Sequence, residues 1–233
     1  AADVKFHTKD GVLYYKNPIT GGMELKGCPY LRTGVLYIEE GTTVIPSGAL
    51  SNVRFTEIYI PYTVKQIDNN AIYYCNNLTK IVFLPAPEGV DEVALTLDER
   101  SIAGCRQMTE LTIPARLSNF NPNVLYNCTG LVSIDVVGEG GNYSAVGENG
   151  KKVLCSADGK TLVFCPRGKS GEYTIPAGVE IIGESAFADC YYLTKVTIPG
   201  YVTTIGNSAF RNNSTYTYNS MLAQVVFEED GQS

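Results

Sequence analysis

The sequence predicts a repeat solenoid that is mainly β, and three observations support this prediction. Apolar positions recur at a spacing of 23 residues, for example from Ile175 to Ile198 and from Phe187 to Phe210. Short runs of alternating apolar and polar residues, each followed by a proline, recur with them. Hydrophobic residues make up 44% of the 233 residues, enough for a sizeable core. A unit of this length cannot bury its own apolar side chains, whereas stacked units can.

Each unit opens with a strand. In the run from Glu57 to Pro61, isoleucines alternate with other residues, so one face of the strand points inward. The proline ends the strand because it has no N–H to donate to a ladder. The best-preserved unit continues with Val202-x-x-Ile205-Gly206 and Ala209-Phe210. Gly183 and Gly206 share one repeat position, which predicts a turn conformation there.

Two segments break the period. Cys75 and Cys105 are 30 residues apart, which indicates an insertion of seven residues within 85–93. Between Val136 and Ile175 the spacing is 39, so a long excursion replaces part of a repeat over residues 138–172. The excursion contains two β-rich runs around Ala157-Asp158-Gly159, which predicts an inserted β-hairpin. With the turn centred there, Cys155 would lie opposite Thr161.

These features divide the chain into three parts. Residues 1–30 repeat part of the excursion pattern and are expected to form an N-terminal β-hairpin or cap. Residues 31–227 are expected to form a solenoid of about seven coils, with Val225-Val226-Phe227 as a terminal strand. Residues 228–233 are expected to be a polar tail.

The repeat pattern resembles a known family. Leu-x-x-Val-x-Ile-Pro-x-x-Val-x-x-Ile-Gly-x-x-Ala-Phe-x-x-Cys is similar to the BspA-type leucine-rich repeat, found in bacterial, spirochaete and protozoan surface proteins. The resemblance covers roughly residues 31–227 and departs in repeat four, where Asn121-Pro122-Asn123-Val124-Leu125 replaces Gly-x-x-Ala-Phe. It implies a right-handed leucine-rich-repeat coil with a parallel concave sheet and short helical turns or irregular segments on the convex side.

The resemblance also implies a protein that is secreted or attached to the bacterial cell surface. The chain opens at Ala1-Ala2-Asp3 without a charged and apolar targeting segment. No apolar run is long enough for a transmembrane segment. The net charge of -6 speaks against a nucleic-acid partner, because phosphate would repel an acidic chain.

Residues with catalytic or ligand chemistry are sparse. His7, near the N-terminus, is the single histidine, which speaks against Ser-His-Asp chemistry and excludes histidine-rich metal sites. The acidic cluster Asp91, Glu92, Asp98 and Glu99 lacks the calcium-loop pattern and is most simply a solvated loop. Neither Gly-x-Gly-x-x-Gly nor a phosphate-binding Gly-Lys-Ser/Thr loop occurs. We therefore expect no enzyme, no metal and no cofactor.

The seven cysteines are expected to be free thiols. Cys75, Cys105, Cys128 and Cys190 share one repeat position and should form a column of small buried hydrophobes. Side chains in such a column run parallel, a poor starting geometry for disulfides. Cys155 and Cys165 flank the expected hairpin, with Cys165 well away from Cys155.

The strand pattern also predicts which residues face outward on the concave sheet. One outward column consists of Tyr37, Tyr59, Val82, Thr112, Asp135, Thr174, Thr197 and Val226. A second column, two residues earlier in each strand, consists of Glu57, Lys80, Glu110, Ser133, Glu172 and Lys195. Tyr37 and Tyr59 should lie on adjacent coils and form an aromatic platform beside Glu57 and Lys80. Tyrosine suits the recognition of protein or sugar, so this platform is a candidate binding surface. Alternatively, cross-strand tyrosines merely stabilise the sheet.

The candidate partner-binding residues are Tyr37, Tyr59, Glu57, Lys80, Glu110, Thr112, Asp135 and Lys195. We expect a non-catalytic interaction module that adheres to host or neighbouring-cell macromolecules, with a protein or a glycan as its partner. One alternative is a carbohydrate-binding or carbohydrate-processing protein, for which Glu57 with Glu110 or Asp135 would have to share a deep pocket. Another is a rigid spacer within a larger surface protein.

Overall fold

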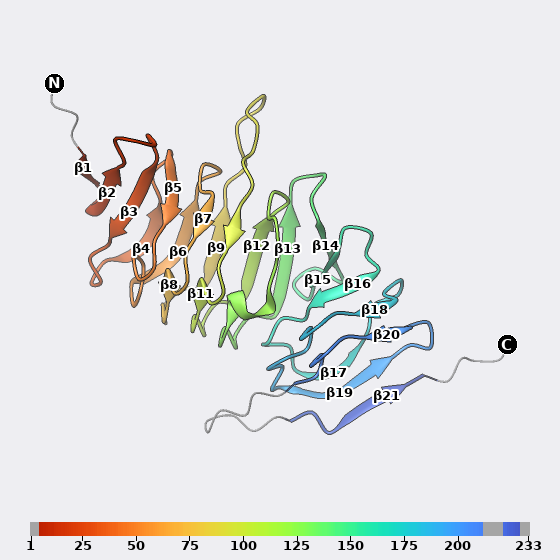
Figure 1. Ribbon diagram of the computed structural model, residues 1–233. Coiled ribbons are helices and arrows are strands. Elements are labelled where there is room, and N and C mark those ends of the chain that lie inside the picture. Colours follow the sequence, from red (N-terminus) through yellow and green to blue (C-terminus); the bar gives the residue numbers. More distant parts are fainter. Residues whose placement is uncertain (1–4, 212–220, 229–233) are drawn as a thin grey trace.

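The computed structural model describes residues 5–211 and 221–228, which form a β-solenoid of stacked coils (Figure 1). The longest strands of successive coils lie side by side in a parallel sheet, which we call the first long-strand sheet. Its strands, in spatial order, are β13 (Ser133–Val137), β12 (Glu110–Pro114), β9 (Lys80–Phe83), β6 (Arg54–Ile60) and β4 (Thr33–Tyr37). Each coil supplies one strand, as the 23-residue period predicts.

The other side of these coils is also built from strands. An antiparallel meander of β1 (Phe6–Lys9), β2 (Val12–Lys16) and β3 (Met23–Gly27) continues in parallel through β5 (Thr42–Ile45), β7 (Gln66–Ile67) and β10 (Thr96–Leu97). The short strands β8 (Ile72–Tyr73) and β11 (Ile102–Ala103) pair separately. This side is therefore more regular than the helical turns or irregular segments that we expected.

A 3-10 helix, η1 (Pro122–Leu125), lies where repeat four departs from the sequence pattern. The side chain of Asn121 caps it by accepting a hydrogen bond from the Asn123 N–H at 2.9 Å. Val124 and Leu125 are buried. The departing sequence thus still fills the core position of its coil.

The second part of the chain repeats this construction. An antiparallel meander of β14 (Tyr143–Val146), β15 (Val153–Ser156) and β16 (Thr161–Phe164) continues in parallel through β18 (Ile181–Ile182) and β20 (Thr204–Ile205). The second long-strand sheet consists of β17 (Gly171–Thr174), β19 (Leu193–Ile198) and β21 (Gln224–Phe227). Its strands run at a steep angle to β12 and β13 (Figure 1).

The expected hairpin is present as β15 and β16, but its register differs from our expectation. Cys155 lies opposite Leu162, whereas a turn centred on 157–159 would pair Cys155 with Thr161. The Cys155–Leu162 pairing centres the turn between Asp158 and Gly159, half a residue later than expected, and a separate register shift follows beyond it, between Leu154 and Cys155.

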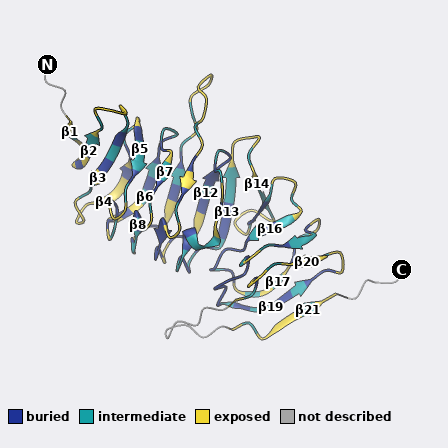
Figure 2. Ribbon diagram, in the orientation of Figure 1, coloured by how far each residue is buried: buried dark blue, intermediate teal, exposed yellow. Residues whose placement is uncertain are grey.

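Buried side chains form one core in each part. The first includes the inward residues Ile58, Ile81, Leu111 and Ile134, all at most 1% exposed. The second lies between the second long-strand sheet and the strands β16, β18 and β20, and includes Leu162, Ile182 and Val196. Along the long strands, buried and more exposed residues alternate, as Figure 2 shows.

Gly183 and Gly206 each begin a turn, as predicted, because the N–H groups of Ala186 and Ala209 donate to their carbonyls at 3.3 Å. Neither glycine has a positive φ. A Cβ at Gly183 would lie 2.9 Å from the carbonyl oxygen of Leu162, and one at Gly206 would lie 2.6 Å from the backbone nitrogen of Glu184. Glycine recurs at this position because adjacent coils approach each other closely there.

The insertion of repeat three lies between β9 and β10. In Figure 1 it projects as a long loop beyond the ends of the neighbouring strands. The Ala86 N–H donates to the Glu92 carboxylate at 3.0 Å, so the loop makes its own internal contact. At the other end of the chain, Glu228 of the expected polar tail is exposed, and residues 229–233 lie outside the described residues.

Candidate binding surface

Tyr37 and Tyr59 form a stacked pair on the outer face of the first long-strand sheet. They lie directly opposite each other on β4 and β6. Their ring centroids are 4.5 Å apart and the ring planes differ by 18°. Tyr37 is 60% exposed. The strand period therefore placed both rings correctly on an outward column.

The hydroxyl of Tyr59 is anchored within the sheet. It donates a hydrogen bond to Oε2 of Glu57 at 2.8 Å. This bond to a carboxylate raises the pKa of Tyr59, with smaller contributions from desolvation and from nearby Glu57 and Tyr37. The phenol is consequently neutral and held in one orientation at physiological pH, which suits a preformed contact surface.

A row of alternating charge runs beside the tyrosine pair. Glu57, Lys80 and Glu110 are in register across β6, β9 and β12, so Lys80 lies between the two glutamates. Opposite charges on adjacent strands stabilise a sheet modestly. Thr112 is on the next outward column, in register with Val82 and Asp135. The candidate residues from Tyr37 to Asp135 thus share one sheet face.

Asp135 and Lys195 differ from the other candidates in their surroundings. The Asp135 carboxylate lies 2.6 Å from Nζ of Lys152, which belongs to the loop before β15. Lys195 belongs to the second long-strand sheet, where its Nζ lies 3.4 Å from the Glu172 carboxylate. The outward columns are therefore continuous within each sheet but interrupted between β13 and β17.

The carboxylates that the glycosidase alternative requires lie on an open sheet face. Glu57 and Glu110 are two strand spacings apart, with Lys80 between them. Asp135 is bound to Lys152. This arrangement is unlike the closely spaced carboxyl pair of a retaining glycosidase.

A cavity of about 460 Å³ lies at the interruption between the sheets. Its lining includes Val132, which precedes β13, and the strand residues Glu172, Tyr173 and Thr174 of β17. Lys169 also lines it and is 7% exposed. Its Nζ donates a hydrogen bond to the carbonyl of Lys151 and lies 5.5 Å from the ring centroid of Tyr173. Burial lowers the pKa of Lys169.

Arg167 joins the two parts of the molecule near this cavity. Its side chain is fully buried, and its Nη2 lies 3.6 Å from Oδ2 of Asp189, which is also buried. The guanidinium also donates to the carbonyls of Pro122 and Leu125 in η1 and of Ala188 in the second part. A buried charge needs such a set of partners.

Other residues that drew attention in the sequence have structural contacts. His7 contacts Glu39 at 2.8 Å and stacks on Tyr14. Of the acidic cluster, Glu92 accepts from the projecting loop and Asp98 accepts from Gln66. Over residues 5–211 and 221–228, no three histidine, cysteine, aspartate or glutamate side chains are grouped to hold a metal.

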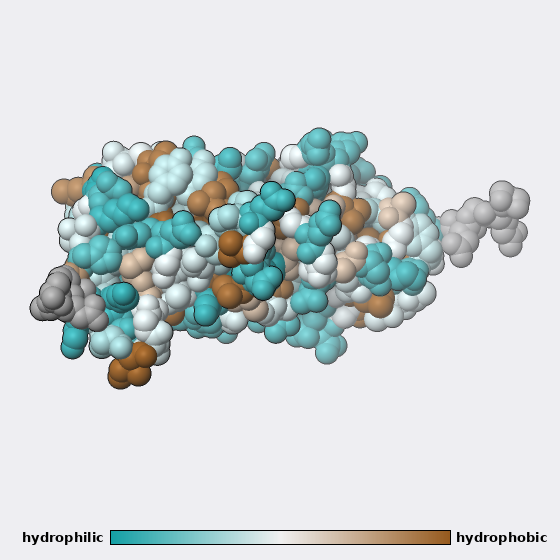
Figure 3. Space-filling view, turned by 90° about the horizontal axis from the view of Figure 1, so that it is seen from above, coloured by the Kyte–Doolittle hydropathy of each residue, from teal (hydrophilic) through white to brown (hydrophobic). Residues whose placement is uncertain are grey.

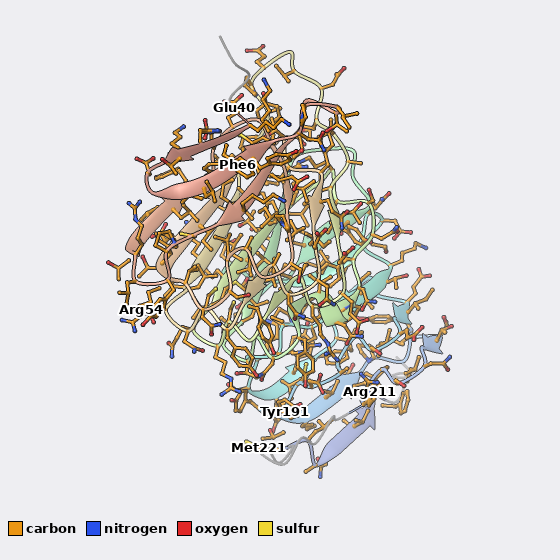
Figure 4. The ribbon with its side chains drawn as sticks, turned by 60° about the vertical axis from the view of Figure 1, so that its left-hand side comes forward. Phe6, Glu40, Arg54, Tyr191, Arg211 and Met221 are labelled. Atoms are coloured by element: carbon orange, nitrogen blue, oxygen red, sulfur yellow. The ribbon has the colours of Figure 1, made fainter. Side chains whose placement is uncertain are left out.

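Tyr191 is not available as a surface aromatic, because it is only 6% exposed. Its hydroxyl donates to Oδ1 of Asp189 at 3.1 Å, and its carbonyl accepts from the Met221 N–H. Figure 4 shows Tyr191 and Met221 together in the C-terminal part, far from Arg54 in the early coils.

The repeat pattern matches a family model. Six copies of the BspA type leucine rich repeat region span residues 43–144 and 163–226, which together are more than half of the chain. The chain belongs to the BspA-type leucine-rich repeat family. No curated protein matches it in sequence.

Several solved structures resemble this BspA-type chain. A leucine-rich repeat protein from Eubacterium ventriosum is 16% identical, with a TM-score of 0.53 over 97% of this chain and 72% of that one. A leucine rich cell surface protein from Faecalibacterium prausnitzii is 18% identical (TM-score 0.41; 96% and 76% covered). The pneumococcal vaccine antigen PcpA is 17% identical (TM-score 0.47; 88% and 67% covered). At these identities the likeness concerns the fold alone.

Sequence reasoning missed Arg167 and Lys169 of the BspA-type solenoid. Both lie in the excursion, outside the 23-residue period that identified the other candidates. A second offset could have drawn attention to this segment, because Cys28-Pro29, Gly34 and Ile38 recur 137 residues later as Cys165-Pro166, Gly171 and Ile175.

In the described residues, no helix is long and apolar enough to cross a membrane.

Proposed function

We propose that this protein is a non-catalytic interaction module of the bacterial surface. It would bind a protein or glycan macromolecule through the outer face of the first long-strand sheet, around Tyr37 and Tyr59. Membership of the BspA-type family supports the non-catalytic repeat scaffold and the surface location. Repeat solenoids present extended, rigid faces of the kind that large partners require.

The observation that carries the proposal is the stacked tyrosine pair, in which Tyr37 is exposed and Tyr59 is half-buried. Stacking alone would stabilise the sheet, yet it leaves Tyr37 60% exposed. A partner could bury this ring together with the neighbouring charges of Glu57 and Lys80, and tyrosine loses little entropy in such a contact. In the view from above in Figure 3, apolar residues are scattered among hydrophilic ones.

Binding to an array of matrix proteins, cell-surface proteins and glycans tests the proposal. Tyr37→Ala combined with Tyr59→Ala should weaken binding to the array partner at least about tenfold, since truncated aromatic anchors typically cost more than about 1 kcal/mol. Tyr201→Ala is a matched control, because Tyr201 is 45% exposed outside the first sheet.

The outcomes separate the proposal from its alternatives. A protein ligand that the double variant binds as well as the wild type would place the site elsewhere. A glycan ligand lost with the tyrosines would assign the platform to carbohydrate recognition. If no ligand binds, the rigid spacer replaces adhesion as the function.

A further inference from the structure

β17 has an open edge within the described residues. Over 5–211 and 221–228 it pairs with β19 alone. The N–H groups of Gly171 and Ile175 donate to the carbonyls of Tyr192 and Thr197, on the β19 side. Because N–H groups alternate between the two edges of a strand, those of Glu172 and Thr174 point to the open edge. An open edge of this kind is a template for another strand.

The cavity of about 460 Å³ runs along this edge. Glu172, Tyr173 and Thr174 all line it. Consecutive strand residues point to opposite faces, so a cavity that touches three in a row follows the strand edge. Val132 and residues of the 147–151 loop also line the cavity. Space for an added backbone therefore lies directly beside unpaired backbone groups.

Lys169 gives this cavity a charge preference. Its side chain lines the cavity, and only 7% of the residue is exposed. In the described residues its Nζ has a carbonyl and an aromatic face as neighbours, and no carboxylate forms an ion pair with it. The other charged residues of the lining are Glu148, Lys151 and Glu172, of which Glu172 is bound to Lys195. A buried ammonium of this kind gains from an incoming carboxylate.

We infer that the gap beside β17 is a docking site for an extended protein segment, which adds a strand to β17 and places an Asp or Glu side chain against Lys169. This is recognition by β-strand addition, in which backbone hydrogen bonds give affinity and a side-chain pocket gives specificity. The segment pairs with about four residues, the length of β17. The inference rests on the proposed role as an interaction module but uses a surface separate from the tyrosine pair.

Binding of immobilised peptides to the full chain tests this inference. The peptides alternate Val and Thr, with Glu, Gln or Lys at the central position. The Glu peptide should bind most tightly. Thr174→Pro should weaken its binding at least about tenfold by removing an edge N–H, whereas Thr174→Val keeps the N–H and should bind normally. Proline at this position spares the ladder to β19.

A second pair of variants tests the charge. Lys169→Met should make the Glu and Gln peptides bind equally, and Lys169→Arg should preserve the preference for Glu. This comparison does not depend on whether Thr174→Pro folds. The inference is overturned if the wild type binds Glu and Gln peptides equally, or if a polyuronate glycan binds through Lys169 and no peptide does.

The tyrosine variants keep this test distinct from that of the proposed function. Tyr37→Ala with Tyr59→Ala should leave peptide binding at β17 unchanged. If those variants lose partner binding and the wild type shows no preference among the peptides, the β17 site is contradicted but the proposed function is not.

Discussion

At the scale of single residues, four cysteines connect neighbouring coils. Each donates an S–H hydrogen bond to a carbonyl of the preceding coil: Cys75 to Leu50 (3.0 Å), Cys105 to Ile72 (3.9 Å), Cys128 to Ile102 (3.4 Å) and Cys190 to Cys165 (3.6 Å). All seven cysteines are free thiols, and all except Cys28 are buried. Burial is thus the property that governs their chemistry.

Thiol labelling should separate Cys28 from the other six cysteines. The native protein should react quickly with a water-soluble maleimide at Cys28 alone, because only this side chain is partly exposed. Burial raises the pKa of Cys155 to about 12, which further suppresses its thiolate. Intact mass measured before and after unfolding in urea checks this expectation. Fast native labelling at several sites would contradict it.

The pH dependence of stability should reflect buried Tyr14. Burial, partly offset by a hydrogen bond from the Glu39 N–H, raises the pKa of Tyr14 to about 12, from 10.0 in the unfolded chain. Between these values the native state keeps a proton that the unfolded state releases, so stability falls as pH rises from 10 to 12. Urea unfolding at increasing pH measures this decline.

Tyr14→Phe provides the comparison for this pH series. The variant should lose stability less steeply over the same pH range, because phenylalanine has no proton to release. An equally steep decline in the variant would show that other groups, such as Cys155, dominate.

At the scale of elements, the strand period predicted the long strands and most of their outward columns, including the Tyr37–Tyr59 pairing. Ser133, which was expected to face outward, is buried, with the Lys152 N–H donating to its Oγ. The period succeeded because inward residues at fixed spacing must stack to be buried. It could not predict the β17 edge or the cavity, because the excursion follows no 23-residue period. Nor could it show that the close approach of the neighbouring coil, rather than a positive φ, selects glycine at Gly183.

The junction between the two parts depends on a close backbone approach at Gly168. Its N–H donates to the Leu131 carbonyl at 2.6 Å, and a Cβ there would lie 2.7 Å from the backbone carbon of Gly130. Gly168→Ala should therefore lower the melting temperature by several degrees. The new Cβ would clash with backbone atoms of Gly130, which cannot rotate away from it as a side chain would.

Gly27→Ala is the matched control for this substitution. A Cβ at Gly27 would have no neighbouring atom within 4 Å, and the φ of Gly27 is not positive. Its substitution should leave the melting temperature nearly unchanged. Equal effects of the two substitutions in thermal unfolding followed by circular dichroism would rule out the close approach as the cause.

At the scale of the whole molecule, the two cores meet across a polar junction. Arg167 spans it, with carbonyls of η1 on one side and Asp189 and Ala188 on the other. Arg167, paired with Asp189 within the second part, thus couples the two parts through its hydrogen bonds to the carbonyls of η1. Its geometry could not be predicted from the repeat pattern, because Arg167 lies in the excursion, outside the 23-residue period.

Arg167→Met should uncouple the two parts. Removing one member of a buried ion pair leaves the other charge uncompensated, at a cost of about 3–5 kcal/mol in the free energy of unfolding. Urea unfolding should then show separate transitions for the two cores. Arg54→Met, at an exposed residue that contacts the ring of Tyr30, should change little. A single transition with a small loss in Arg167→Met would contradict the coupling role.

The duplicated construction also bears on how such genes change length. The meander β1–β3 and the meander β14–β16 each start a run of parallel coils, and their first strands begin 137 positions apart, at Phe6 and Tyr143. A DNA segment that encodes one meander and its coils therefore carries its own starting structure. Recombination between the two copies would add or remove a whole unit in frame, so we expect natural variants to differ by units of this size more often than by single coils.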